Sequence, residues 1–281
     1  MAKHYPTVRT FEITPVTPVS STTRVLDSGK LLSQVNRRLY RYTRYYDLKL
    51  DLNQNSLQTI EVFALRDDWA VQKGVQMAYQ QYLENTAHER NKLTDGQVAR
   101  WEDFRVSDGV AGAHDDLFAT LRDQNMAATR LGVGEFALSN VVDAANVKKT
   151  FTWSPAPSSG EYGILVEYEK SGRMDLSPAT IEADMAYADI DAMTNDATAD
   201  DLKSDGNAPP YDQNTVNEQG PWVRVGTIGG TAGVQQLSTG FFCAPCGIVV
   251  LKGVASDGDL DLRVTYKKGD YKGVSAPSML E

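Results

Sequence analysis

The sequence predicts a mainly β protein, a jelly-roll β-sandwich of about eight antiparallel strands with a helical insertion. Short segments with an apolar residue at every second position recur along the chain, and turn residues such as Gly, Pro, Asn and Asp separate them. One long helical pattern interrupts this series. Antiparallel strands with long connections are typical of a jelly roll, in which two sheets pack face to face, and a different β-sandwich is the alternative.

The composition is that of a folded protein with space for one large β domain. The chain has 281 residues, of which 41% are apolar and 23% are charged. Its net charge of −9 excludes a uniformly basic nucleic-acid binder, because neutralising phosphates requires an excess of Lys and Arg. No segment approaches the roughly 18 apolar residues of a membrane span, and residues 1–20 lack the apolar run of a signal peptide. We therefore expect synthesis in the cytosol and no membrane partner.

Residues 1–23 are rich in Thr, Ser, Pro and Val and show no helical period. They predict an extended N-terminal arm. Proline lacks the N–H that a central strand donates, which argues against a central place for this segment; its prolines are Pro6, Pro15 and Pro18. Residues 24–281 are predicted to form a single jelly-roll domain.

A short helix with one basic side is predicted directly after the arm. Asp27 or Ser28 is a suitable N-cap. Apolar residues then recur at helical spacing, at Leu31, Val35, Leu39 and Tyr42. Arginines recur on another face of the same helix, at Arg37, Arg41 and Arg44.

Two strands and the helical insertion follow. Residues 46–52 alternate apolar and charged side chains, and residues 57–65 form a second apolar stretch after a turn. These two strands are predicted to form a hairpin or to lie next to each other. The insertion, residues 67–104, contains the longest helical pattern of the chain and a shorter one at residues 97–104.

More strands are predicted after residue 106. Alternation and flanking turn residues place them at residues 134–138, 147–153, 162–169, 222–227, 240–252 and 260–267. Residues 181–214 are rich in Asp and Glu and contain a single lysine, so we expect a long, acidic, solvated loop there.

The basic segment, residues 24–49, stands out in this acidic chain. Its seven Lys and Arg residues and two Asp residues give it a charge of +5, and four tyrosines lie among the arginines. Arginine and aromatic side chains together suit single-stranded nucleic acid, through phosphate pairing and base stacking. A solvated helix face with tyrosines packed under neighbouring strands is the alternative. The candidate nucleic-acid-binding residues are Arg37, Arg38, Arg41 and Arg44.

Two further motifs favour structural roles. Cys243 and Cys246 have the spacing of a redox dithiol, but a strand pattern follows them in place of the helix that lowers a thiol pKa. Two buried or loop thiols are the favoured interpretation, and the role of the pair stays open. The glycine-rich residues 226–233 lack the lysine of a phosphate-binding loop, which favours a turn.

Signals for a metal site or a catalytic site are weak. Alternating carboxylates make a weak calcium candidate, although the other ligands of a calcium loop are missing; they are Asp257, Asp259 and Asp261. A structural calcium ion is therefore the one cofactor considered. None of the three histidines has triad spacing, and no serine lies in a Gly-x-Ser-x-Gly elbow, so we expect no enzyme activity.

Several segments resemble a known family. Residues 29–41, GKLLSQVNRRLYR, and residues 99–106, ARWEDFRV, resemble parts of the capsid proteins of small circular single-stranded DNA viruses known from environmental samples. Residues 62–66 and 79–85 are similar to the same family. The resemblance covers roughly residues 24–106, under a third of the chain, and carries no catalytic motif.

The resemblance implies a jelly-roll subunit that assembles with copies of itself into an icosahedral shell. It implies packaging of a single-stranded DNA genome, location in the virion and synthesis in the cytosol of a host cell. Many such proteins begin with an arm rich in Arg and Lys, whereas residues 1–23 hold only Lys3 and Arg9. Genome binding would then fall to the basic segment.

The sequence leaves three alternatives to a capsid subunit open. A β-sandwich surface or binding module, for example one that binds carbohydrate, would use Trp153 and Trp222 as a platform. Another phage structural subunit, such as a tail or spike protein, would form rings or fibres. An enzyme on a β-sandwich would require an acid–base cluster that the sequence does not show.

Overall fold

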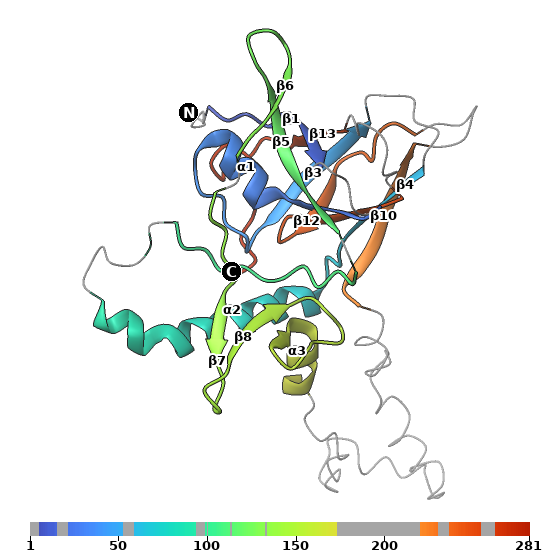
Figure 1. Cartoon of the computed structure of the whole chain (residues 1–281). Helices are drawn as coiled ribbons and strands as arrows, with labels where there is room; N and C mark the ends of the chain where they lie inside the picture. Colours follow the sequence, from blue (N-terminus) through green and yellow to red (C-terminus); the bar gives the residue numbers. More distant parts are fainter. Residues whose placement is uncertain are drawn as a thin grey trace, which may run out of the picture.

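Strands dominate the structure, a computed structural model that describes residues 6–15, 22–52, 59–93, 99, 101–112, 114–132, 134–172, 220–229, 236–253 and 262–281. Within these residues ten strands belong to one sheet and three form a smaller sheet. The small sheet and two of the helices lie on one side of the large sheet (Figure 1).

The large sheet consists of two halves of four antiparallel strands. One half has the order β1 (Thr10–Pro15), β13 (Leu262–Tyr266), β3 (Tyr45–Leu52) and β11 (Phe242–Pro245). The other half has the order β2 (Arg24–Asp27), β12 (Ile248–Lys252), β4 (Thr59–Leu65) and β10 (Trp222–Gly229). Among these eight strands, taken in chain order, the first pairs with the last, the second with the seventh, the third with the sixth and the fourth with the fifth.

A further strand joins the two halves along one side. β5 (Asp115–Arg122) runs antiparallel to β1 and pairs in parallel with the start of β2. β6 (Ala128–Arg130) pairs with the outer part of β5. The hairpin of β5 and β6 projects from the body of the protein (Figure 1).

Residues 236–239 join the two halves along the other side. Gly229 at the end of β10 donates its N–H to Gln236 O at 2.8 Å. On β3, Leu52 N donates to Leu237 O at 2.8 Å, and Leu50 O accepts from Thr239 N at 3.0 Å. The large sheet is therefore nearly closed around its core.

The first apolar core lies inside this sheet. Every second side chain of β3 points inward, as the alternation in the sequence predicts, and Tyr46, Leu48 and Leu50 are fully buried there. Ile13 of β1 and Val264 of β13 pack into the same cluster.

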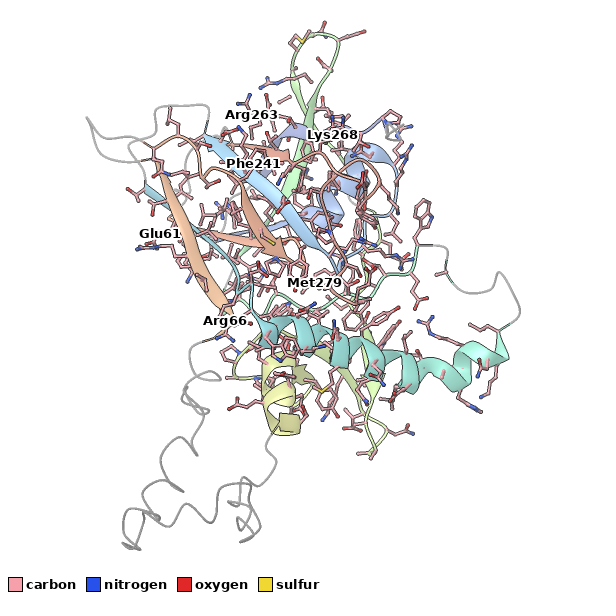
Figure 2. The ribbon with its side chains drawn as sticks, turned by 180° about the vertical axis from the view of Figure 1, so that it is seen from behind. Glu61, Arg66, Phe241, Arg263, Lys268 and Met279 are labelled. Atoms are coloured by element: carbon pink, nitrogen blue, oxygen red, sulfur yellow. The ribbon has the colours of Figure 1, made fainter. Side chains whose placement is uncertain are left out.

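The second apolar core lies between the outer face of β12 and the insertion that connects β4 to β10. β12 is apolar up to its last residue, Lys252, because Val249 and Leu251 face the first core while Ile248 and Val250 face the second. Met279 near the C-terminus fills the space between the sheet and the long helix (Figure 2).

The insertion is a layer of helices and a small sheet. Its long helix is α2 (Trp69–Lys92), which begins where Asp68 Oδ1 accepts the N–H of Val71 at 2.9 Å. The small sheet has the order β7 (Asn140–Val142), β8 (Lys148–Thr152) and β9 (Glu161–Gly163). It leads into α3 (Ile164–Gly172), which packs closely on Gly74 of α2. The remaining helix, α1 (Ser28–Asn36), connects β2 to β3.

Several sequence predictions are confirmed. The mainly β fold class is confirmed by the two sheets. The strands predicted at residues 46–52, 57–65, 147–153 and 222–227 appear as β3, β4, β8 and β10. Residues 240–252 form two strands, because a tight turn at Cys246 and Gly247 divides them into β11 and β12.

The arm was predicted to stay out of central strands, and this is wrong for Thr10–Pro15. These residues form β1, which lies between β5 and β13. Pro15 is tolerated because it is the last residue of the strand. The prediction that residues 46–52 and 57–65 are neighbours is also wrong, since β3 pairs with β11 and β13 while β4 pairs with β10 and β12.

Other differences lie in the insertion. Residues 134–138 are not a strand, and most of residues 162–169 belong to α3, because a short apolar run does not distinguish a strand from a buried helix. Residues 101–104 of the second helical pattern are not helical. β2, β5, β6 and β7 were not predicted. The acidic loop, residues 181–214, lies outside the described residues.

The turn between β11 and β12 generates a stability prediction. Gly247 has φ +68°, and an added Cβ would lie 2.7 Å from both Ser28 Cβ and Tyr46 Cδ2. Gly240 has φ +70° with nothing within 4 Å of such a Cβ. Both G240A and G247A incur about 1–2 kcal/mol of backbone strain. G247A should lose about 1–3 kcal/mol more through overpacking, measured by urea unfolding. Equal losses for the two variants would contradict the described packing.

Candidate nucleic-acid interface

Helix α1 ends before the arginines that were predicted to lie on it. Arg37 adopts a left-handed conformation with φ 51°. The side chain of Asn36 accepts the N–H of Val8 at 2.8 Å and donates to Val8 O at 3.1 Å. This contact with a distant segment ends the helix, so the predicted basic helix face does not form.

The four candidate arginines nevertheless lie in one stretch on the surface. Arg37 and Arg38 are exposed, and the Arg41 side chain is about half exposed. Arg41 Nη1 donates to Glu102 O at 2.6 Å and lies 3.6 Å from Asp103 Oδ1.

Arg44 is held by the C-terminal segment. Its guanidinium lies 3.6 Å from the centre of the Tyr271 ring, and its Nη1 donates to Ala276 O at 2.8 Å. Stacking and hydrogen bonding fix this side chain, so it contributes positive charge to the site with little freedom to reorient.

Two cations from distant parts of the chain join these arginines. Lys272 follows β13, and the guanidinium groups of Arg41, Arg44 and Arg38 add to burial in lowering its pKa. Arg9 precedes β1 and donates from Nη1 to Gly273 O at 3.3 Å. Sequence reasoning did not identify either cation, because both lie outside the basic segment and no local pattern connects them to it. The basic patch is defined here as Arg9, Arg37, Arg38, Arg41, Arg44 and Lys272.

The other cations of the basic segment have structural places. Arg24 is fully buried in β2. Lys30 forms an ion pair with Asp116 at 2.7 Å, and Lys49 forms one with Asp51 at 3.0 Å. The segment charge of +5 therefore overstates the charge that it presents on one surface.

The tyrosines of the basic segment belong to the core. Tyr40, Tyr42 and Tyr46 are almost completely buried, so the hypothesis that they stack on bases is wrong for these three. Trp101 is an exposed aromatic residue that sequence reasoning did not single out, and 58% of its surface is exposed. The signal that could have identified it is its position among charged residues, between Arg100 and Glu102.

A buried cluster of charged side chains, Arg105, Asp27 and Asp103, lies next to the basic patch. Arg105 forms an ion pair with Asp27, whose other oxygen caps α1 by accepting Lys30 N at 2.9 Å. Arg105 Nη1 also lies 3.7 Å from Asp103 Oδ2. Burial lowers the pKa of Arg105 to about 10. The pKa of Asp103 is raised to about 6, because burial outweighs the hydrogen bond from Tyr42 N and the charge of Arg41.

A cavity of about 730 Å³ opens beside Arg37 and Arg38. It lies between the end of α1, the segment that contains Trp101, and the residues before β7. Its walls combine apolar and aromatic groups with charged ones: Leu39, Trp101, Phe136, Leu138, Arg105 and Lys148.

This arrangement is suited to a polyanion. Guanidinium and ammonium groups pair with phosphate oxygens, and an exposed indole next to them offers a stacking surface for a base.

The described part of the chain has no helix that is long and apolar enough to cross a membrane.

Other candidate sites from the sequence give no assembled site. Burial raises the pKa of the Cys243 thiol to about 12 and raises that of the fully buried Cys246 thiol as well, which opposes thiolate chemistry. Among the described residues, no three His, Cys, Asp or Glu side chains are placed to hold a metal ion. The weak calcium candidates Asp257, Asp259 and Asp261 lie outside those residues.

Comparison of the chain with protein-family models, with curated proteins and with solved structures gives no match.

The buried Asp103 generates a pH prediction. The folded chain keeps its proton up to about pH 6, whereas an unfolded aspartate loses it near pH 4. The folded chain then binds more protons in this interval, so Asp103 stabilises the fold below about pH 4 and this contribution is lost as the pH rises to about 6.

The measurement is urea unfolding of the wild type and D103N across this interval. The unfolding free energy of the wild type relative to D103N should fall by up to about 3 kcal/mol between about pH 4 and about pH 7. The difference between the wild type and D270N, a variant at an exposed position, should stay constant over the same interval. A constant difference between wild type and D103N would contradict the assigned burial.

Proposed function

We propose that this protein is a viral capsid subunit, which assembles with copies of itself into an icosahedral shell and encloses a single-stranded DNA genome. The observation that carries the proposal is the nested pairing of the eight strands β1–β4 and β10–β13. Such pairing supports a jelly roll, a long hairpin rolled into two facing sheets. β5 to β9, α2 and α3 are then insertions between the fourth and fifth strands.

A jelly roll alone does not select this function. Capsid, lectin and cupin domains share it, so the surface has to decide between them. The basic patch on a chain of net charge −9 favours a shell subunit, because a shell requires one face directed at a polyanion and other faces directed at solvent.

A carbohydrate-binding module is less well supported. It was expected to use Trp153 and Trp222 as an exposed platform. Trp153 is 1% exposed and donates its indole N–H to Tyr42 Oη at 2.9 Å, and Trp222 is partly buried against the second core. Neither residue is free to stack flat on a sugar ring.

Strand β10 supports a contact between copies. It pairs with β4 on one side, and on its other side the described residues pair with it only at Gly229, through Gln236. Figure 2 shows β10 at the margin of the molecule next to Glu61. Val223 and Val225 on this strand are exposed, and so are Leu237 and Phe241 in the segment that follows. An edge strand with exposed apolar residues is a template for association with another chain.

Lysines at this edge should prevent assembly. In V223K/V225K, charge on the unpaired strand opposes pairing with a second copy. The control V142K/V147K changes two exposed valines at and beside β7. Light scattering should report a dissociated protein for the first variant and assemblies for the control, with unchanged circular dichroism for both. Assembly of V223K/V225K at the wild-type level would remove β10 from the proposed contact.

The exposed arginines should set the salt dependence of nucleic-acid binding. R37A/R38A removes two phosphate contacts, so the slope of log affinity against log salt for single-stranded DNA should decrease by about 1.4. K92A/K170A removes the same charge from α2 and α3 and should keep the wild-type slope. Fluorescence anisotropy with a labelled oligonucleotide provides the measurement. Identical slopes for all three proteins would contradict genome binding by the basic patch.

A further inference from the structure

The cavity beside Arg37 and Arg38 has aromatic and polar walls, which pairing of the arginines with phosphates does not explain. We propose that it binds a nucleobase of the packaged strand, stacked on Trp101 and hydrogen-bonded to Gln34, while Arg37 and Arg38 hold the adjacent phosphates. This inference rests on the proposed nucleic-acid binding and adds a base-binding site to it.

The size and walls of the cavity fit this ligand class. Its volume of about 730 Å³ lies within the range of small-molecule sites, about 300–1,000 Å³. Trp101 contributes an indole with 58% of its surface exposed. Phe136 contributes a second ring, held in place by the Arg105 guanidinium 4.9 Å from its centre.

Gln34 supplies the polar group that a base edge requires. Its Oε1 and Nε2 atoms are both shielded from solvent, and neither has a hydrogen-bond partner among the described residues. The side chain lines the cavity. A buried amide without partners costs free energy, and a ligand with a donor next to an acceptor removes that cost. The edges of nucleobases have this pattern.

A second group in the same wall is also incompletely bonded. Arg105 Nη1 is buried and makes no hydrogen bond, although it lies 3.7 Å from Asp103 Oδ2. The Arg105 side chain lines the same cavity as Gln34. Two buried polar groups without hydrogen-bond partners at one cavity indicate a ligand that accepts and donates hydrogen bonds.

The charges around the opening favour a polyanion. Arg37, Arg38 and Lys148 line the cavity and form no ion pair within the described ranges. The carboxylates of the same wall are largely compensated, since Glu102 pairs with Arg90 and Asp103 lies near Arg41 and Arg105. Glu135 is the remaining carboxylate in the lining. The uncompensated charge of the lining is therefore mainly positive, and the exposed Arg37 and Arg38 can reach the phosphates next to a bound base.

Binding of a single-stranded oligonucleotide is compared with binding of an abasic strand of the same length, using the full-length protein before assembly. The two strands have equal phosphates, so a difference in affinity reports base contacts. The wild type should bind the strand with bases roughly tenfold more tightly. W101A should reduce this preference to about one, and W69A, at a tryptophan that is 65% exposed on α2, should keep it.

Gln34→Leu distinguishes base binding from a structural role. It replaces an amide without partners by an apolar group of similar size, so the unfolding free energy should stay equal or rise. The preference for bases should fall severalfold at the same time. A loss of stability in Q34L would contradict the described environment of Gln34.

The failures of this inference and of the proposed function are distinct. Equal wild-type affinity for the two strands would overturn the base site and leave phosphate binding by the basic patch intact. Absence of binding to both strands would overturn the proposed nucleic-acid function and the base site together.

Discussion

The buried guanidinium of Arg105 is the constraint on which the rest of the surface depends. It pairs with Asp27 at the junction of β2 and α1, lies beside Asp103, and has the ring of Tyr42 5.3 Å away. Arg105 N donates to Ser139 Oγ at 3.0 Å, and Arg105 O accepts the N–H of Ser139 at 2.9 Å. A buried charge of this kind is stable only while its partners stay in place, so one group ties the sheet, helix α1 and the insertion together.

This connection explains why the basic patch and the cavity lie side by side. Asp103 accepts the N–H of Tyr42 and lies near Arg41, which orients the chain that carries the patch. Trp101 is two residues away, and Arg105 itself forms part of the cavity wall. The second core holds the other side of this segment, where Phe104 packs edge-to-face with Tyr79 and at a tilt with Tyr82 of α2. The insertion therefore contributes to the candidate interface, and the sheet supplies the frame.

Apolar periodicity in the sequence predicted the strands and helices that bury one regular face. The alternation from Tyr46 gave β3, and the stripe after Asp68 gave α2, because both elements bury one regular face. α1 ended early because Asn36 bonds to Val8, a contact that no local pattern contains. β5 was missed because only three of its residues, Leu117–Ala119, form an apolar run. Four of the six patch residues were predicted, whereas Arg9 and Lys272 reach the patch only through the pairing of β1 with β13.

Assembly of copies of this chain into a closed shell around nucleic acid is the central proposal. Negative-stain electron microscopy of the purified full-length protein, together with its ultraviolet absorbance spectrum, tests this claim most directly. Closed particles of uniform diameter whose spectrum shows bound nucleic acid are the predicted result. A protein that remains monomeric at every salt concentration and pH would contradict the claim and would leave the nested strand pairing as the frame of a binding module.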